Sequence, residues 1–182
     1  MKPAAPVTII MRCAPKPVGE GDGAKVGALF AASPGDLLHY LRGQMPIVHI
    51  TRRERFSAAH KLARADWSAE MNAATFGKCS NPNWHGHNYE LWVTVKGEPS
   101  PETGFVIDLS ALGRALHEHV VRHLDHKNID LDVPFMKGRL SSTENLAVAI
   151  WEQIKVPVET LGCVLHCVKV QETENNHVEY FG

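Results

Sequence analysis

The sequence predicts an α+β domain, in which helices are segregated from an antiparallel sheet. Three observations support this class. After Met45, segments in which apolar and polar residues alternate, as in strands, occur toward both ends of the remaining chain. Two amphipathic helical segments lie together between them. The resulting order is three strands, two helices and two strands, and not the strand–helix alternation of a doubly wound parallel fold.

Length and composition exclude several classes of protein. The 182 residues are enough for one domain, or for one domain with an appendage. With 19 Lys and Arg against 20 Asp and Glu, the chain has no excess of positive charge that would attract nucleic acid or an anionic membrane. No apolar run approaches the roughly 20 residues that cross a bilayer. Four cysteines do not make a disulfide scaffold and favour a reducing compartment, so we expect a cytoplasmic protein.

Residues 1–44 differ in composition from the rest of the chain. They hold 5 of the 11 prolines and 6 of the 14 glycines, a density that prevents long helices and central strands. We expect a poorly ordered extension over 1–44 and the folded domain over 45–182. A second start at Met45 would still give a complete domain.

Strands are predicted from period-two alternation after Met45. In the clearest, Asn88 to Lys96, the apolar side chains of Tyr89, Leu91, Val93 and Val95 share one face. The other expected strands are Ile47 to Ala58, Phe105 to Leu109, Cys163 to Glu172 and Val178 to Phe181.

Two helices are predicted between these strands. The first runs from about Ser110 to Leu124, with Leu112, Leu116 and Val120 on one stripe. The second follows Ser141-Ser142-Thr143-Glu144, which fits a capping box, and repeats Leu146, Ile150 and Ile154 every four residues.

Three histidines form the most informative constellation. His85 and His87 alternate on a strand, so their imidazoles point to the same face, and Gly86 between them lets another backbone or a ligand approach closely. His60, at the end of the first strand, offers a third imidazole. Three histidines without a fourth protein ligand leave an open position, as in catalytic zinc sites.

Cys79 lies six residues before His85, and Asn81 and Pro82 make a turn between them. It could be a fourth zinc ligand that closes a structural site, a catalytic thiol whose thiolate is favoured by nearby positive charge, or an inert buried cysteine. Spacing alone does not decide among these three roles.

Two further groups suit acid–base chemistry or ligand binding. Asp125-His126 follows the first helix, where the pair could transfer protons or cap the helix end. Glu172 ends an apolar strand, where a carboxylate can hold a planar heterocycle through paired acceptor bonds. His119 and His123 fit a solvated helix face better than a metal site.

Six segments, in this order, resemble the 6-pyruvoyl-tetrahydropterin synthase and 6-carboxy-tetrahydropterin synthase family. They cover about residues 48–182: FSAAHKL, FGKCSNPNWHGHNYELWVTVKGE, TGFVIDL, LDHKNIDLDVPF, SSTENLAVAIWE and VQETENN. The resemblance implies a tunnelling fold, an antiparallel four-stranded sheet with two helices on one face, which assembles into a multimeric barrel and a homohexamer of two trimers.

The resemblance also implies roles for individual residues. Zn²⁺ would be held by His60, His85 and His87. Cys79 would be the catalytic base, with Asp125 and His126 reaching it across a subunit boundary. Glu172 would anchor the pterin, with Thr143 and Glu144 as further pterin contacts.

The implied substrate is 7,8-dihydroneopterin triphosphate, and the family divides by product. One branch eliminates triphosphate to give 6-pyruvoyl-tetrahydropterin. The other, in queuosine biosynthesis, gives 6-carboxy-tetrahydropterin with release of acetaldehyde. The five residues between Cys79 and His85 resemble the pyruvoyl branch, although many bacterial relatives with this spacing belong to the carboxy branch. Trp84 departs from the animal pattern, which has glycine there.

Two other interpretations stay open. The chain could be a non-enzymatic module in which Cys79 and the three histidines close a structural zinc site, or a pterin-binding relative with different chemistry. Arg52, Arg53 and Arg55, with lysines near the site, are candidate triphosphate contacts.

Overall fold

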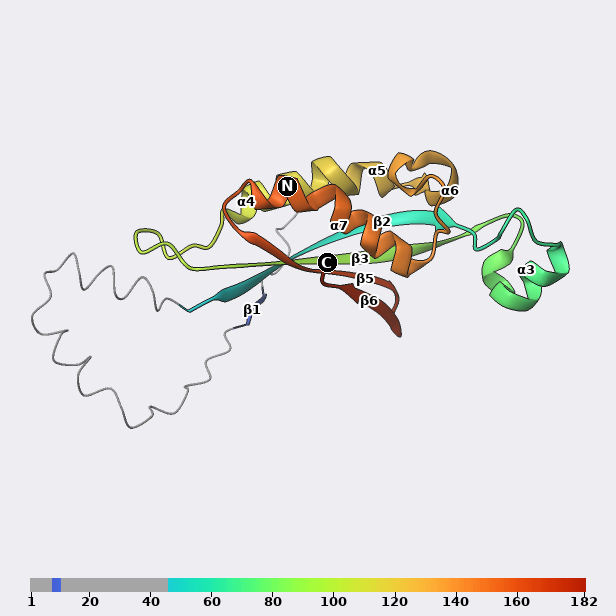
Figure 1. The fold of residues 1–182 in the computed structure, drawn as a ribbon, viewed down its shortest axis with the longest axis horizontal. Coiled ribbons are helices and arrows are strands. Elements are labelled where there is room, and N and C mark those ends of the chain that lie inside the picture. The colour runs from blue at the N-terminus through green and yellow to red at the C-terminus, as the bar shows by residue number, and fades with distance from the viewer. Residues whose placement is uncertain (1–7, 11–45) are drawn as a thin grey trace, which may run out of the picture.

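A computed structural model describes residues 8–10 and 46–182 of the chain (Figure 1). The predicted domain, 45–182, therefore lies almost entirely within the described part. Of the predicted extension, 1–44, only Thr8–Ile10 is described, and it forms a short strand. None of the described helices is long and apolar enough to cross a membrane.

A single twisted sheet forms the base of the domain. Its strands are β1 (Thr8–Ile10), β2 (Val48–His60), β3 (His85–Gly97), β4 (Lys127–Asn128), β5 (Val164–Thr173) and β6 (Asn176–Tyr180). They are ordered β1-β2-β3-β5-β6 with antiparallel neighbours, and β4 pairs in parallel with β2. The sheet has two strands more than the four-stranded sheet that the resemblance implies, β1 and β4, which are too short to give a periodic pattern.

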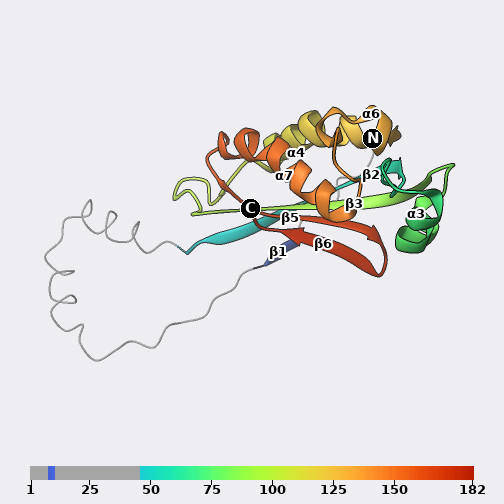
Figure 2. The ribbon, with the colours of Figure 1, turned by 45° about the vertical axis from the view of Figure 1, so that its right-hand side comes forward.

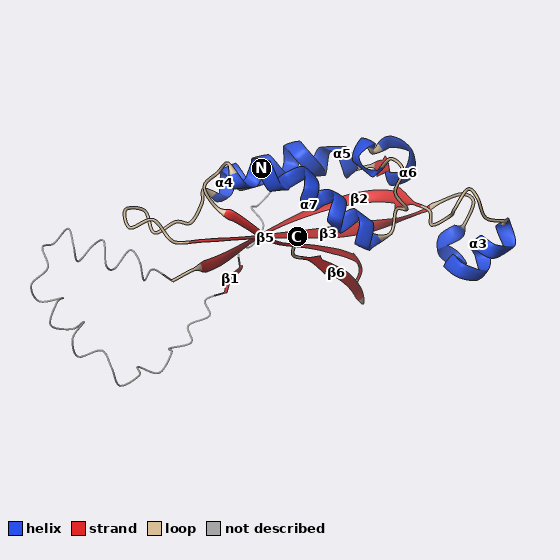
Figure 3. Ribbon diagram, in the orientation of Figure 1, coloured by secondary structure: helices blue, strands red, loops and turns tan. Residues whose placement is uncertain are grey.

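Helices cover one face of this sheet (Figures 2 and 3). The first predicted helix is α4 (Leu109–Leu116), which continues through a π-helical turn (His117–Val121) into α5 (Arg122–Leu124). The second is α7 (Thr143–Glu159), which packs on β5 and β6. The sequence did not indicate α3 (Ala69–Phe76), which lies beyond the ends of β2 and β3, or the single turn of α6 (Ile129–Asp132).

The core lies between the sheet and the two long helical segments. The side chains predicted to share one face of β3 are buried, and so are the predicted stripes of α4 and α7. These buried residues are Tyr89, Leu91, Val93, Val95, Leu112, Leu116, Val120, Leu146, Ile150 and Ile154. Strand alternation and helical periodicity therefore identify the two layers correctly.

The strand predicted over Phe105 to Leu109 is wrong. Gly104, at φ 72°, ends a turn, and Phe105 is 67% exposed. The Asp108 carboxylate then accepts a hydrogen bond from the Ser110 backbone N–H at 2.7 Å and begins α4. A side-chain cap thus competes with strand pairing at this point, and the cap fixes the start of the helix.

The cap of α7 is displaced by one residue from the prediction. Ser142, and not Ser141, is the N-cap, because its hydroxyl accepts from the Asn145 N–H at 3.4 Å. Ser141 is buried instead, and its hydroxyl donates to the Lys61 carbonyl at 3.1 Å. The shift places the Ser141 backbone beside the end of β2.

Candidate active site and metal centre

The register of β2 and β3 brings the three predicted metal histidines together. His60 is the direct cross-strand partner of His85, and His87 lies two residues further along the same face of β3. The ligand atoms of the three side chains all lie within 4.8 Å of one another. This convergence was predicted from the His-x-His spacing, and two paired strands produce it without any contribution from a loop.

Hydrogen bonding fixes the orientation of His60, which is 1% exposed. Its Nδ1 lies 2.8 Å from the Ser141 carbonyl oxygen, and because a carbonyl can only accept, Nδ1 carries the proton. The Nε2 lone pair of His60 therefore faces the cluster, as in metal sites whose histidines are held by an outer hydrogen bond. Sequence reasoning missed this role of Ser141, because a backbone carbonyl leaves no signature in the sequence.

The donor atoms of the cluster fit a metal ion. His60 Nε2, His85 Nδ1 and His87 Nε2 are buried and have no hydrogen-bond partner. Burial, with the neighbouring His60 and His87, lowers the pKa of His85, and burial lowers the pKa of His87 although Glu172 opposes it. Both rings are thus neutral at pH 7, the form that binds metal.

Gly86 lies where β3 passes close to β2. A Cβ at this position would lie 3.1 Å from the Ala58 carbonyl oxygen, closer than most real side chains approach. The glycine predicted to permit a close backbone approach does so toward the neighbouring strand.

Glu172 lies near the C-terminal end of β5, beside the histidines. Its Oε1 accepts a hydrogen bond from the Thr143 hydroxyl at 3.0 Å and lies 3.5 Å from His60 Nε2. Thr143 and Glu144, in the first turn of α7, line the same cavity of about 350 Å³ as Glu172. The three predicted pterin contacts therefore share one cavity.

Cys79 lies on the 3₁₀ segment Gly77–Ser80, which follows α3. The Leu62 N–H donates to the Cys79 carbonyl at 2.8 Å, which ties this segment to the end of β2. Cys79 lines the Glu172 cavity and also a larger cavity of about 930 Å³ that includes His85 and His87. Among the described residues, the group whose ligand atoms lie close enough together to hold a metal ion contains the three histidines and not Cys79.

Asp125 and His126 line neither of the two cavities that contain Cys79. The Asp125 carboxylate accepts from the Ser57 N–H at 2.9 Å and lies 3.1 Å from His126 Nδ1. His126 has φ 59° and is 82% exposed. The pair lines a cavity of about 540 Å³ with Ser57 and Asn88, separate from the two cavities that contain Cys79.

The arginine cluster and the two remaining described cysteines, which the sequence also offered as candidates, line none of the cavities that contain Cys79. Arg52 pairs with Glu54, and Arg53 and Arg55 both pair with Glu90. Burial raises the pKa of the Cys163 and Cys167 thiols, which is typical of inert core cysteines.

Comparison with known proteins identifies the family. A family model described as 6-pyruvoyl tetrahydropterin synthase matches residues 49–182. The chain belongs to the 6-pyruvoyl tetrahydropterin synthase family. It is 49% identical over 133 residues to the human protein named 6-pyruvoyl tetrahydrobiopterin synthase, an alignment that covers 73% of this chain and 90% of the human one.

The chain is also similar to two further proteins with names of this synthase family. A Bacillus subtilis protein named 6-carboxy-5,6,7,8-tetrahydropterin synthase is 27% identical over 147 residues, which cover 78% of this chain and 90% of that one. The solved structure of the Caenorhabditis elegans 6-pyruvoyl tetrahydropterin synthase matches with a TM-score of 0.70 and 41% identity, over 76% of this chain and 97% of that chain.

Proposed function

We propose that the protein is a zinc-dependent lyase that eliminates triphosphate from 7,8-dihydroneopterin triphosphate to give 6-pyruvoyl-tetrahydropterin. The observation that carries the proposal is the arrangement of Cys79, which borders both the three-histidine cluster and the Glu172 cavity. The family match and the identity to the human synthase support this activity.

Each residue has a role in this chemistry. A zinc ion held by His60, His85 and His87 would bind the hydroxyls of the substrate side chain and stabilise developing negative charge. Cys79 would remove a carbon-bound proton from that side chain and return one to the ring. Glu172, aligned by Thr143 and aided by Glu144, would accept hydrogen bonds from the pterin and so orient those protons toward Cys79.

The pyruvoyl product is favoured over the carboxy product by similarity. The human pyruvoyl-forming relative is 49% identical, against 27% for the Bacillus subtilis carboxy-forming one. The alternative, a 6-carboxy-tetrahydropterin synthase of the queuosine route, differs in releasing acetaldehyde. Among the described residues, the group that could hold a metal ion contains the three histidines without Cys79, which favours an open catalytic site over the other alternative, a structural zinc module.

We also propose that the site is completed by assembly. Asp125 and His126 lie in a cavity separate from Cys79, as expected if they act on the Cys79 of another subunit. The form we propose, a homohexamer built as a multimeric barrel from two trimers, is the one that the family resemblance implies. The even charge and the cysteine content support a cytoplasmic location and a small-molecule partner in place of nucleic acid or membrane.

Product analysis tests the proposal. The zinc-loaded protein is incubated with 7,8-dihydroneopterin triphosphate, and the products are identified by mass. We expect 6-pyruvoyl-tetrahydropterin and triphosphate. Acetaldehyde with 6-carboxy-tetrahydropterin would assign the other branch, and unchanged substrate would refute the lyase proposal.

A further inference from the structure

Two cavities of opposite charge meet at Cys79. The smaller, of about 350 Å³, is lined by Glu144 and Glu172 and by no lysine or arginine. The larger, of about 930 Å³, is lined by Lys61 and Lys78 and by no carboxylate. Since Cys79 lines both, a ligand whose reacting carbons lie at the thiol has one cavity on either side of those carbons.

The proposed substrate has a matching division of charge. Its neutral pterin, with N–H donors, suits the carboxylate cavity, and its triphosphate is joined through the short side chain that reacts at Cys79. We propose that the larger cavity is the triphosphate subsite and that Lys61 and Lys78 are its anion-binding residues. This inference rests on the proposed function, and it assigns residues that the similarity to known synthases does not.

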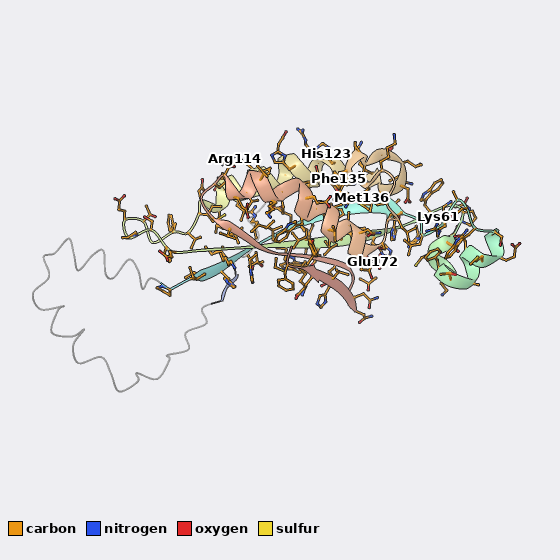
Figure 4. The ribbon with its side chains drawn as sticks, viewed as in Figure 1. Lys61, Arg114, His123, Phe135, Met136 and Glu172 are labelled. Atoms are coloured by element: carbon orange, nitrogen blue, oxygen red, sulfur yellow. The ribbon has the colours of Figure 1, made fainter. Side chains whose placement is uncertain are left out.

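Lys61 is held in place from two directions. Its Nζ lies 4.6 Å from the centre of the Trp84 ring, a cation–π distance, and its backbone N–H donates to Asp130 Oδ2 at 2.8 Å. Figure 4 shows Lys61 beside α3, at the end of the sheet toward which Glu172 also lies. A lysine that follows His60 directly is thereby fixed near the metal centre.

Both lysines are available to an anion. Within the described part of the chain, no carboxylate forms an ion pair with Lys61 or Lys78. Lys78 directly precedes Cys79 and is exposed. The arginines suggested by the sequence are not equivalent, because Arg52, Arg53 and Arg55 already pair with glutamates and line neither cavity.

Inorganic tripolyphosphate is the probe for this subsite. Its binding to the zinc-loaded protein is measured by equilibrium dialysis, at concentrations that leave the zinc content unchanged, because polyphosphates bind divalent metals. Lys61→Met and Lys78→Met should each weaken binding about 10-fold, the loss of one charge-assisted hydrogen bond. Lys61→Arg and Lys78→Arg, which keep the charge, should bind within about 3-fold of the parent. Lys155→Met, an exposed lysine on α7, is the matched control and should bind normally.

The outcome separates this inference from the proposed function. Unaltered tripolyphosphate binding in the Lys61→Met, Lys78→Met double variant, or equal weakening by Lys155→Met, would overturn the subsite even if the protein converts the substrate. Lysine-dependent binding in a protein that does not convert it would keep the anion subsite and refute only the lyase proposal. In an active enzyme, both variants should raise KM for the triphosphate substrate and leave kcat nearly unchanged.

Discussion

The three histidines that could hold a metal ion and the proposed proton-transfer residues are positioned by different parts of the fold. His60, His85 and His87 lie on two strands paired in continuous register, so the sheet alone brings them together. Cys79 lies on a short 3₁₀ segment, and Asp125 and His126 follow a helix and line a different cavity. All three histidines of the candidate metal centre therefore come from one chain, whereas the proposed proton relay needs residues of two.

Removal of a metal ligand should have the largest effect. His85→Ala or His87→Ala leaves two imidazoles where three are needed, so each should lose most of its zinc and nearly all turnover. Zinc is measured by elemental analysis and turnover by product formation. His119→Ala, an exposed histidine on the helical layer, should retain both. Full zinc occupancy in the His85, His87 double variant would refute the metal assignment.

Variants of the proton relay test whether the site is shared between subunits. His126→Ala and Cys79→Ala should each lower turnover by about 10²–10⁴, the usual loss for a general acid or base. Assembled together from unfolded subunits in equal amounts, the two variants should regain activity at about a quarter of the sites, by random assortment. No recovery in the mixed oligomer would show that both residues act within one chain.

Substitution of Trp84 should have a smaller effect, on the free energy of unfolding, through backbone strain. Its φ of 59° favours glycine, the residue that the resemblance implies for animal enzymes. Trp84→Gly relieves the strain and Trp84→Ala does not, so the glycine variant should have the larger free energy of unfolding, by about 1 kcal/mol. Both variants lose the ring beneath Lys61 and should raise KM for the triphosphate substrate to a similar extent. Equal stability of the two variants in chemical denaturation would contradict the strain argument.

Truncation should have the smallest effect. A chain that begins at Met45 keeps every proposed site residue and loses only β1 from the described sheet, where Thr8–Ile10 pair with residues 49–51. Zinc content, oligomer size and turnover should stay within about 2-fold of the full chain, since an edge strand of this length contributes few contacts. Size-exclusion chromatography and the product assay measure this, and loss of the oligomer would show that the first 44 residues support assembly.

Sequence reasoning succeeds here where periodicity determines position. The alternation in β3 predicts both the buried face and the convergence of His85 with His87, and the four-residue repeat predicts the buried stripe of α7. It fails where one local hydrogen bond decides, as at Asp108, whose cap begins a helix in place of the predicted strand.

Other features lie beyond any pattern in the sequence. The Ser141 carbonyl that orients His60 depends on a backbone path, and the division of charge between the two cavities depends on where α3 and α7 lie. The roles of Cys79, Asp125 and His126 came from the resemblance, because loop residues have no period from which their neighbours can be derived. The Cys79 alternatives remain distinguishable by experiment.

The most direct test of the central claim, a metal centre separate from its catalytic thiol, is the zinc content and turnover of Cys79→Ala measured in one preparation. Alkylation of the parent protein should also modify Cys79 faster than the buried Cys163 and Cys167, whose pKa values are raised. For Cys79→Ala, we predict one zinc per chain, intact folding, and a turnover at least about 10²-fold lower than that of the parent protein. Loss of zinc together with unfolding, or normal turnover, would contradict the account.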